Sequence, residues 1–469
     1  MKSPALLIPT RFNVSLVRGR KALLLLALSA AIMLYLGGNS DLGTNPQREL
    51  VFTLLSSALG LGALVILALR KDIAPTLGQV LLLAVVLRVI AAMAWPLLED
   101  DYFRYLWDGR QTALFLSPWQ HPPEFFFSQA QLAQQWQWIL NNINYPELPS
   151  IYGPVLQYVF ALAYYIAPGN LTALQGLLVL TDVCILLSLY AMRVSCRWLT
   201  AYAIHPLLLK EAIASAHPDL MVALALIWCL YGWQQRRPLL TGVALGIALG
   251  AKISALVVLP FVLVQVQALR NYPVHFGWFM KVLLYCGITL ALLYAPLLQL
   301  SGSEWYSLQT FAREWRFNPL LFRLIEAVAP AGYARETSAL VLLVGLAVLW
   351  IRWRSRVNNH YPPVDLALLC LLLVSPVVNS WYWLWLLPIT VLMGRAWLFY
   401  FCAFAVLSYG HGGNISPADG LLQFHVSPWI ALAQGGTLLL CFLLQQRYHK
   451  KAVFSDLQCN KTQSAQSIS

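Results

Sequence analysis

Charged residues are scarce in this chain. Only 11% of its 469 residues are charged and 59% are apolar, whereas an ordinary soluble domain has about 25% charged residues. The mean hydropathy is +0.65, and many apolar runs approach the roughly 20 residues that cross a bilayer. The composition therefore excludes a soluble enzyme, a disordered regulator and a secreted disulfide scaffold. It predicts an all-α, polytopic membrane protein.

Motifs for redox chemistry, zinc binding and nucleic-acid binding are also lacking. The eight cysteines form no C-x-x-C pair and show no zinc spacing, and no convincing internal repeat occurs. The net charge of +12 comes without a basic face that carries stacking aromatics, so we expect no nucleic acid among the partners. We attribute the excess of Lys and Arg to the positive-inside bias of membrane proteins.

Basic residues also set the orientation of the apolar runs. We expect one integral membrane domain over 1–453, about 14 transmembrane helices, both termini in the cytoplasm, and a polar, disordered cytoplasmic tail at 454–469. The expected spans are 22–38, 51–69, 77–97, 172–192, 198–214, 218–234, 239–253, 255–268, 275–298, 337–351, 363–378, 381–394, 396–410 and 428–445. The run 151–169 is ambiguous, and we interpret it as re-entrant or interfacial.

Two outer segments of substance follow from this topology, 98–171 and 299–336. The first is rich in tryptophan, which is typical of interfacial helices. Nearly all acidic residues fall at the outer side, although they were not used to assign the topology. The exceptions are Asp72, Asp182, Asp365 and Asp456. This distribution indicates that the outer face carries the chemistry.

Three adjacent carboxylates, Glu99, Asp100 and Asp101, lie at the outer end of the run 77–97. Their mutual repulsion should raise at least one pKa unless a cation offsets it. A carboxylate there can act as a general base on a hydroxyl, and Asp100 with Asp101 can bind a divalent cation such as Mg²⁺ or Mn²⁺. A solvated acidic helix end is the alternative interpretation. The residues that follow favour a site, because they supply phosphate and sugar-ring contacts: Arg104, Tyr105, Trp107 and Arg110.

Four ionisable residues lie near the outer ends of two consecutive spans. They are Lys210, Glu211, His217 and Asp219. Such residues at membrane depth are costly and usually functional, but a Lys210–Glu211 charge pair with a helix cap at Asp219 explains them equally well. Lys252 follows glycines spaced for helix packing and can meet a lipid phosphate.

The remaining candidates are a mid-membrane pair and several aromatic or basic residues. Arg88 and Asp182 lie within spans, and we interpret them as buried partners of an ion pair. The second outer segment contributes Arg316 to a mixed aromatic and charged patch. After Pro376, Trp381 and Tyr382 form either a sugar platform or part of an aromatic belt.

Taken in order, these motifs resemble the GT-C superfamily of glycosyltransferases that use a polyprenyl-phosphate sugar donor. The resemblance is to bacterial polyprenol-phosphate-mannose-dependent α-mannosyltransferases and to the catalytic subunit of GPI mannosyltransferase I. It covers about residues 80–390. The matching residues are Asp100-Asp101, Arg104-Tyr105, Trp107–Arg110, Pro149–Pro154 with Tyr152, Pro206–Glu211, His217, Asp219, Lys252, Pro376 and Trp381-Tyr382. Gly153 replaces the first proline of the family's Tyr-Pro-Pro turn, and an insertion interrupts its Pro-Trp-Tyr motif.

The resemblance implies transfer of a hexose, with mannose expected, on the periplasmic face of a bacterial inner membrane. The acceptor is a lipid or glycan hydroxyl. Asp101 or Asp100 would act as the base of an inverting reaction, and Arg104, Lys252 or Arg316 would supply charge to the leaving phosphate. The other matched residues and Glu99 would bind substrate or donor, and a metal is not required.

A flippase or transporter of lipid-linked sugars is the alternative function. It is motivated by Arg88, Asp182, Lys210 and Glu211 at membrane depth. Transporters commonly contain paired repeats and broken helices in both halves. Because this chain shows no repeat and its acids gather on one face, we favour the enzyme.

Overall fold

The computed structural model describes residues 11–39, 46–114, 116–128, 132–264, 272–298, 304–355, 361–411 and 427–466. In this part of the chain the regular structure is helical and no β-strand occurs. The exception to the helical pattern is an isolated bridge between Phe317 and Val377. The all-α prediction is therefore confirmed over the described ranges.

Six helices among the described residues are long and apolar enough to cross a membrane. They belong to α1 (Arg11–Gly38), α2 (Pro46–Leu69), α7 (Leu171–Ala191), α12 (Tyr272–Leu298), α15 (Ala334–Arg354) and α19 (Pro428–Gln466). Their length and composition are those of a membrane protein, which agrees with the sequence prediction. The count of about 14 spans stays a prediction.

Shorter elements account for the other apolar runs. They are α3 (Leu77–Ala92), α6 (Pro154–Ile166), α8 (Cys196–Ala203), η2 (Leu208–Ala214), α9 (Leu220–Gln234), α10 (Pro238–Ala251), η3 (Ile253–Val258), α11 (Leu259–Val262), α16 (Val364–Val374), η5 (Ser380–Trp385), α17 (Leu387–Leu392), α18 (Ala396–Cys402) and η6 (Ala405–His411). Several runs expected as one helix are broken. The break between α8 and the π-helical element η2 falls at Ile204 and His205, and Pro206 follows it directly. A proline cannot donate a backbone hydrogen bond.

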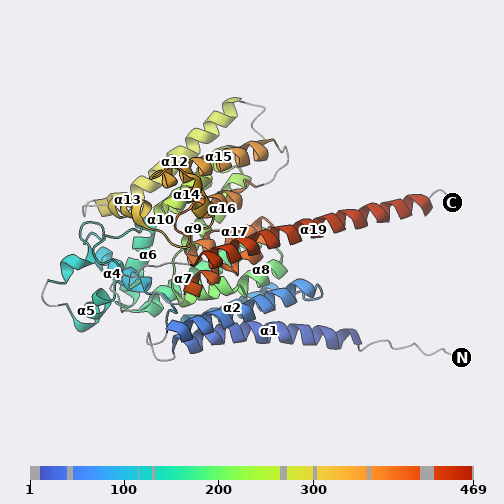
Figure 1. Ribbon diagram of the computed structural model, residues 1–469, viewed down its shortest axis with the longest axis horizontal. Helices are drawn as coiled ribbons and strands as arrows, with labels where there is room; N and C mark the ends of the chain where they lie inside the picture. The colour runs from blue at the N-terminus through green and yellow to red at the C-terminus, as the bar shows by residue number, and fades with distance from the viewer. Residues whose placement is uncertain are drawn as a thin grey trace.

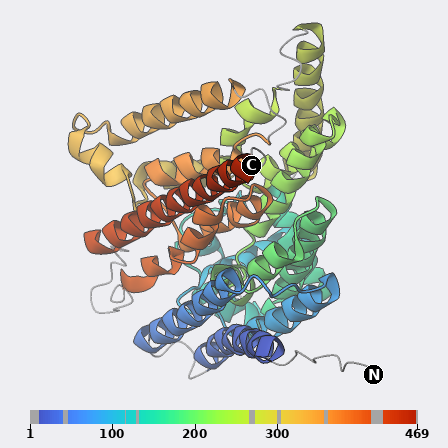
Figure 2. The same cartoon turned by 90° about the vertical axis from the view of Figure 1, so that its right-hand side faces the viewer.

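The segments expected on the outer face gather at one end of the molecule. They contain α4 (Asp101–Ala113), η1 (Pro123–Phe126), α5 (Gln134–Asn141), α13 (Trp305–Glu314) and α14 (Phe322–Val328). Figure 1 shows α4, α5 and α13 at its left, whereas α1 begins and α19 ends at its right. Turned by 90°, the long helices α1 and α2 still lie side by side (Figure 2).

The expectation of a polar, disordered cytoplasmic tail from Phe454 stays a prediction. Helix α19 continues without interruption to Gln466. No glycine or proline occurs between Arg447 and Gln466, and adding residues to a preformed helix avoids the cost of nucleation. Residues 467–469 lie outside the described part of the chain.

The predicted buried ion pair joins α3 to α7. Arg88 Nε donates to Asp182 Oδ2 at 2.7 Å, and both side chains are fully buried. The other carboxylate oxygen accepts from the Tyr202 hydroxyl at 2.6 Å. The prediction is confirmed, and the two charges satisfy each other within the bundle.

Candidate functional site

Asp101 lies where the chain enters α4. It is the first residue of that helix, and the preceding Asp100 is solvent-exposed and accepts a hydrogen bond from the Asn144 side chain. Asp101 is partly buried, and its Oδ2 accepts from the Tyr105 hydroxyl at 3.4 Å. The two neighbouring carboxylates therefore occupy different surroundings.

Burial raises the pKa of Asp101 to about 7. The negative charge of Asp100 raises the pKa further, whereas the positive charge of Lys252 and the Tyr105 hydrogen bond oppose the shift. A carboxyl group with a pKa near neutrality can exchange protons with a substrate hydroxyl more effectively than an ordinary aspartate can. This pKa favours Asp101 as a general base, and the role stays a prediction.

Lys252 provides a cation that lies next to two aromatic rings. Its Nζ donates to Asp219 Oδ1 at 2.8 Å, and the same oxygen accepts from Trp385 Nε1 at 2.5 Å. Nζ lies 5.0 Å from the Tyr382 ring centre and 5.4 Å from that of Trp385, and the two rings stack at 4.7 Å. Lys252 remains 17% exposed, so its charge stays available to an anionic ligand.

His217 connects this arrangement to the bundle interior. Its Nδ1 lies 2.9 Å from the Tyr105 hydroxyl, so Tyr105 touches both His217 and Asp101. The imidazole stacks on Trp381, with ring centres 3.9 Å apart and planes inclined by 11°. The predicted residues Tyr105, His217, Asp219, Lys252, Trp381 and Tyr382 thus gather around Asp101, and we name them with Asp101 the Asp101 site.

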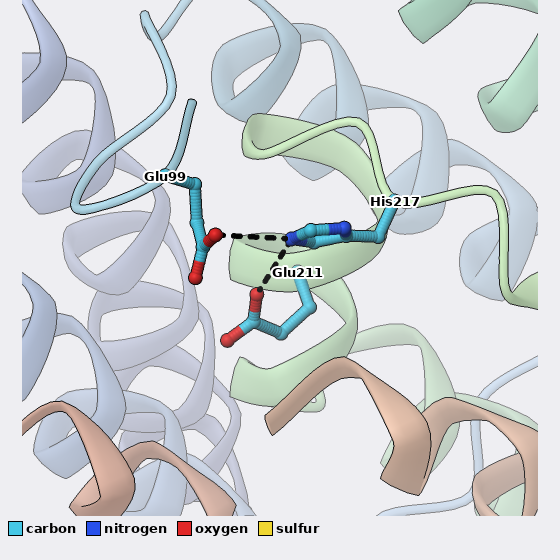
Figure 3. Close-up of side chains that lie close together, drawn as sticks. All are labelled: Glu99, Glu211 and His217. Atoms are coloured by element: carbon cyan, nitrogen blue, oxygen red, sulfur yellow. Dashed lines mark ion pairs between the residues drawn. The ribbon is translucent and has the colours of Figure 1, made fainter. Parts of the chain in front are cut away.

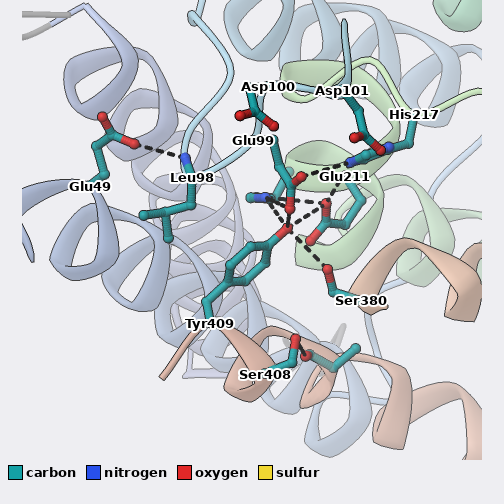
Figure 4. Close-up of polar contacts among 12 residues, drawn as sticks. Glu49, Leu98, Glu99, Asp100, Asp101, Glu211, His217, Ser380, Ser408 and Tyr409 are labelled. Carbon is teal, nitrogen blue, oxygen red and sulfur yellow. Dashed lines mark hydrogen bonds and ion pairs between the residues drawn. The ribbon is translucent and has the colours of Figure 1, made fainter. Parts of the chain in front are cut away.

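A second group of polar residues lies next to the Asp101 site (Figure 4). The Tyr409 hydroxyl donates to Glu99 and accepts from Lys210 Nζ at 2.5 Å and from Ser380 Oγ at 3.0 Å. Lys210 Nζ also donates to Glu211 Oε2 at 3.2 Å. The Lys210–Glu211 pair of the alternative interpretation is therefore present, within a larger network, whereas among the described residues the Asp219 side chain makes no hydrogen bond that caps α9. Burial raises the pKa of Glu99 well above its usual range, although the charge of Lys210 opposes this.

The turn before α6 approaches the end of α10 very closely. A Cβ atom at Gly153 would lie 2.4 Å from the carbonyl oxygen of Gly250, a distance that no side chain tolerates. Tyr152 is held beside Tyr105, with ring centres 5.3 Å apart. Gly153, which departs from the family's proline, therefore brings Tyr152 and the segment before Lys252 together.

Four predicted binding residues contact protein groups elsewhere. Arg104 donates to Asp108 at 3.1 Å and to the Leu148 carbonyl at 2.6 Å, which anchors α4 to the turn before α6. Trp107 is buried, and the Arg110 guanidinium lies 5.5 Å from its ring centre. Arg316 forms an exposed pair with Glu326 at 2.6 Å. Their contacts give no sign that they reach the Asp101 site, and their roles stay predictions.

Sequence reasoning missed Tyr409, Trp385 and Ser380. Tyr409 lies at the outer end of the expected span 396–410, and this position was a usable signal because polar groups there face the acidic cluster. Trp385 is one of several aromatic residues that follow Trp381, and nothing in the sequence distinguishes it from a residue of an aromatic belt.

No family model, curated protein or solved structure matches this chain. The functional argument therefore depends on the residues and their geometry. Three donors in the described ranges, Glu99, Glu211 and His217, lie close enough to share a metal ion. Metal binding by Asp100 and Asp101 stays a prediction.

Proposed function

We propose that the chain is a membrane glycosyltransferase. It moves a hexose, with mannose the first candidate, from a polyprenyl-phosphate donor to a hydroxyl of a lipid or glycan acceptor. The observation that carries the proposal is the Asp101 site, in which a carboxyl group with a pKa of about 7 lies within the electrostatic reach of Lys252. Stacked aromatic rings beside this cation suit a sugar ring and its phosphate.

Two residues of the Asp101 site suit the steps of an inverting transfer. Asp101 takes the proton of the acceptor hydroxyl, whose oxygen forms a bond to the anomeric carbon. The bond between that carbon and the phosphate oxygen breaks, and the electron pair leaves with the lipid phosphate. Lys252 stabilises the added negative charge. The leaving phosphate needs no proton from an acid, so one base and one cation suffice.

Membrane topology forms part of the proposal. The chain would cross a bacterial plasma membrane about 14 times, with both termini in the cytoplasm and the Asp101 site on the periplasmic side. The gathering of α4, α5 and α13 opposite the start of α1 and the end of α19 supports this orientation (Figure 1). The lipid donor would reach the site from the membrane.

The direct test uses purified protein with labelled polyprenyl-phosphate mannose and a lipid extract of the host membrane. We expect a labelled glycolipid from the wild-type protein and at least a 100-fold loss with Asp101→Asn, as is typical when a general base is removed. Asp72→Asn is the matched control, since Asp72 pairs with Arg70 in the α2–α3 connection. Asp100→Asn should retain more activity than Asp101→Asn. Full activity of Asp101→Asn would refute the assignment of the base.

Transport of lipid-linked sugars is tested with the same protein in proteoliposomes. Arg88 and Asp182, which motivated the transport hypothesis, bind each other in the bundle interior, and this weakens the motivation. Movement of a fluorescent polyprenyl-phosphate lipid without any acceptor would favour transport over transfer.

A further inference from the structure

Three metal-type donors converge from separate parts of the chain beside the Asp101 site (Figure 3). Glu99 precedes α4, Glu211 belongs to η2, and His217 lies in the turn after η2. Their donor atoms all lie within 4.8 Å of one another. His217 Nε2 lies 3.7 Å from Oε2 of Glu99 and 3.7 Å from Oε2 of Glu211. The imidazole edge therefore faces two carboxylates.

Two atoms of this group are buried without a hydrogen-bond partner in the part of the chain that the structure describes. They are Nε2 of His217 and Oε1 of Glu211, and both side chains are almost completely buried. Buried polar atoms normally have a partner. The unpaired nitrogen points between the carboxylates rather than toward a protein donor, so a ligand at this place would satisfy it.

The contacts of Tyr105 determine which ring nitrogen of His217 carries the proton. The Tyr105 hydroxyl donates to Asp101, so its oxygen is free to accept the N–H of Nδ1 at 2.9 Å. With Tyr105 donating to Asp101, the proton of His217 would be on Nδ1 and a lone pair on Nε2. Trp381 stacks on the ring and fixes its plane. In that tautomer the lone pair of Nε2 faces two carboxylates, and a cation between them would satisfy all three groups.

The charges in the group support the same conclusion. Glu99 and Glu211 together carry two negative charges when ionised, and Lys210 supplies one positive charge. Lys210 Nζ lies 3.2 Å from Oε2 of Glu211 and 3.9 Å from Oε1 of Glu99. With both carboxylates ionised the group is one positive charge short, and a metal ion that replaces the proton of Glu99 would supply that charge.

We propose that Glu99, Glu211 and His217 bind one divalent transition-metal ion of the Zn²⁺ or Mn²⁺ class. One imidazole nitrogen with carboxylate oxygens suits these ions, whereas Mg²⁺ and Ca²⁺ prefer oxygen donors. Bonds of about 2.1 Å place tetrahedral ligands about 3.4 Å apart. The two separations of 3.7 Å between His217 Nε2 and the carboxylates lie within a few tenths of an ångström of this spacing, and all the donor atoms lie within 4.8 Å of one another.

The ion lies outside the proposed reaction but is linked to it. His217 would bind the metal through Nε2 and hold Tyr105 through Nδ1, and Tyr105 in turn contacts Asp101. A hydrogen bond on the second nitrogen of a metal-bound histidine typically orients the ring. Metal binding by Glu99, Glu211 and His217 would not depend on which sugar or acceptor the protein uses.

The test is a binding measurement on the full chain in detergent, stripped of metal with a chelator. Titration with Mn²⁺, followed by the electron paramagnetic resonance signal of free Mn²⁺, should show one tight site per chain. Pulsed measurements on the bound ion should detect the ¹⁴N nucleus of one imidazole. His217→Gln and Glu211→Gln should each weaken binding at least 10-fold, and Tyr105→Phe should weaken it by about 10- to 100-fold.

His121→Gln is the matched control, since His121 stacks on Phe125 in the first outer segment. It should bind Mn²⁺ as the wild-type protein does. Absence of a tight site for both Mn²⁺ and Zn²⁺ would overturn the proposal, as would unchanged binding in a folded His217→Gln variant. If that variant does not fold, absence of the ¹⁴N coupling in the wild-type protein is decisive. Because the measurement does not depend on transfer, it can succeed or fail separately from the glycosyltransferase proposal.

Discussion

Asp100 and Asp101 are adjacent in the chain, yet their surroundings differ. Asp100 faces solvent, whereas Asp101 is partly buried and contacts Tyr105. Repulsion within the acidic cluster predicts that one pKa rises, but only the folded chain determines which group is buried. The surrounding protein raises the pKa of both carboxyl groups, that of Asp100 to about 6 and that of Asp101 to about 7, and the contact with Tyr105 distinguishes Asp101.

The pKa of Asp101 predicts an acid limb in the pH profile of transfer. A base works in its ionised form, so activity should fall as the pH drops through about 7. Lys252 lowers this pKa. Lys252→Met should therefore move the limb to higher pH as well as reduce the rate, and Lys252→Arg should leave the limb in place. Initial rates from pH 5 to 9 provide the measurement. A limb at the same pH in Lys252→Met would contradict the electrostatic coupling.

At the scale of elements, the positions of most helices could be predicted from apolar runs and basic flanks. The run 172–192 became α7 and the run 239–253 became α10 almost unchanged. The breaks were harder to predict, because the interruption near Pro206 produces a π-helical turn that is stabilised by its neighbours. Because this break could not be predicted, the sequence indicated that Lys210 and Glu211 lie near the outer face, but it did not indicate that they lie beside Tyr409.

The contact between the Gly153 turn and α10 should be sensitive to a single methyl group. Gly153→Ala would place Cβ against the Gly250 carbonyl, and we expect a loss of about 1–3 kcal/mol of stability, as for other overpacked positions. Gly78→Ala is the control, because open space surrounds that position in α3 and helix propensity favours alanine. Thermal unfolding in detergent compares the two. A Gly153→Ala variant as stable as Gly78→Ala would refute the close approach.

The ion pair between α3 and α7 gives a second prediction at this scale. Arg88→Met leaves Asp182 buried with the Tyr202 hydroxyl as its remaining partner among the described residues, and breaking such a pair costs about 3–5 kcal/mol. Replacing both residues, Arg88→Met with Asp182→Leu, should recover much of that loss. The same unfolding assay distinguishes the variants. A single variant as stable as the wild-type protein would show that the pair is not structural.

At the scale of the whole molecule, the distribution of charge along the chain and the direction of the helices lead to the same orientation. Acidic residues were expected at one side from the sequence alone, and the segments that carry them lie together in the fold, opposite the start of α1 and the end of α19 (Figure 1). The sequence could not predict how the segments pack around Asp101, since that depends on close contacts between residues far apart in the chain.

This orientation can be tested by labelling single cysteines introduced into a cysteine-free variant in intact cells. Asn142 follows α5 and Lys71 lies in the connection between α2 and α3, and both are exposed. The positive-inside bias places Lys71 in the cytoplasm, and the direction of α2 then places α5 at the opposite face. Asn142→Cys should react with a membrane-impermeant maleimide from outside, and Lys71→Cys only after permeabilisation. Equal labelling of the two in intact cells would refute the topology, and the reverse pattern would place the Asp101 site in the cytoplasm.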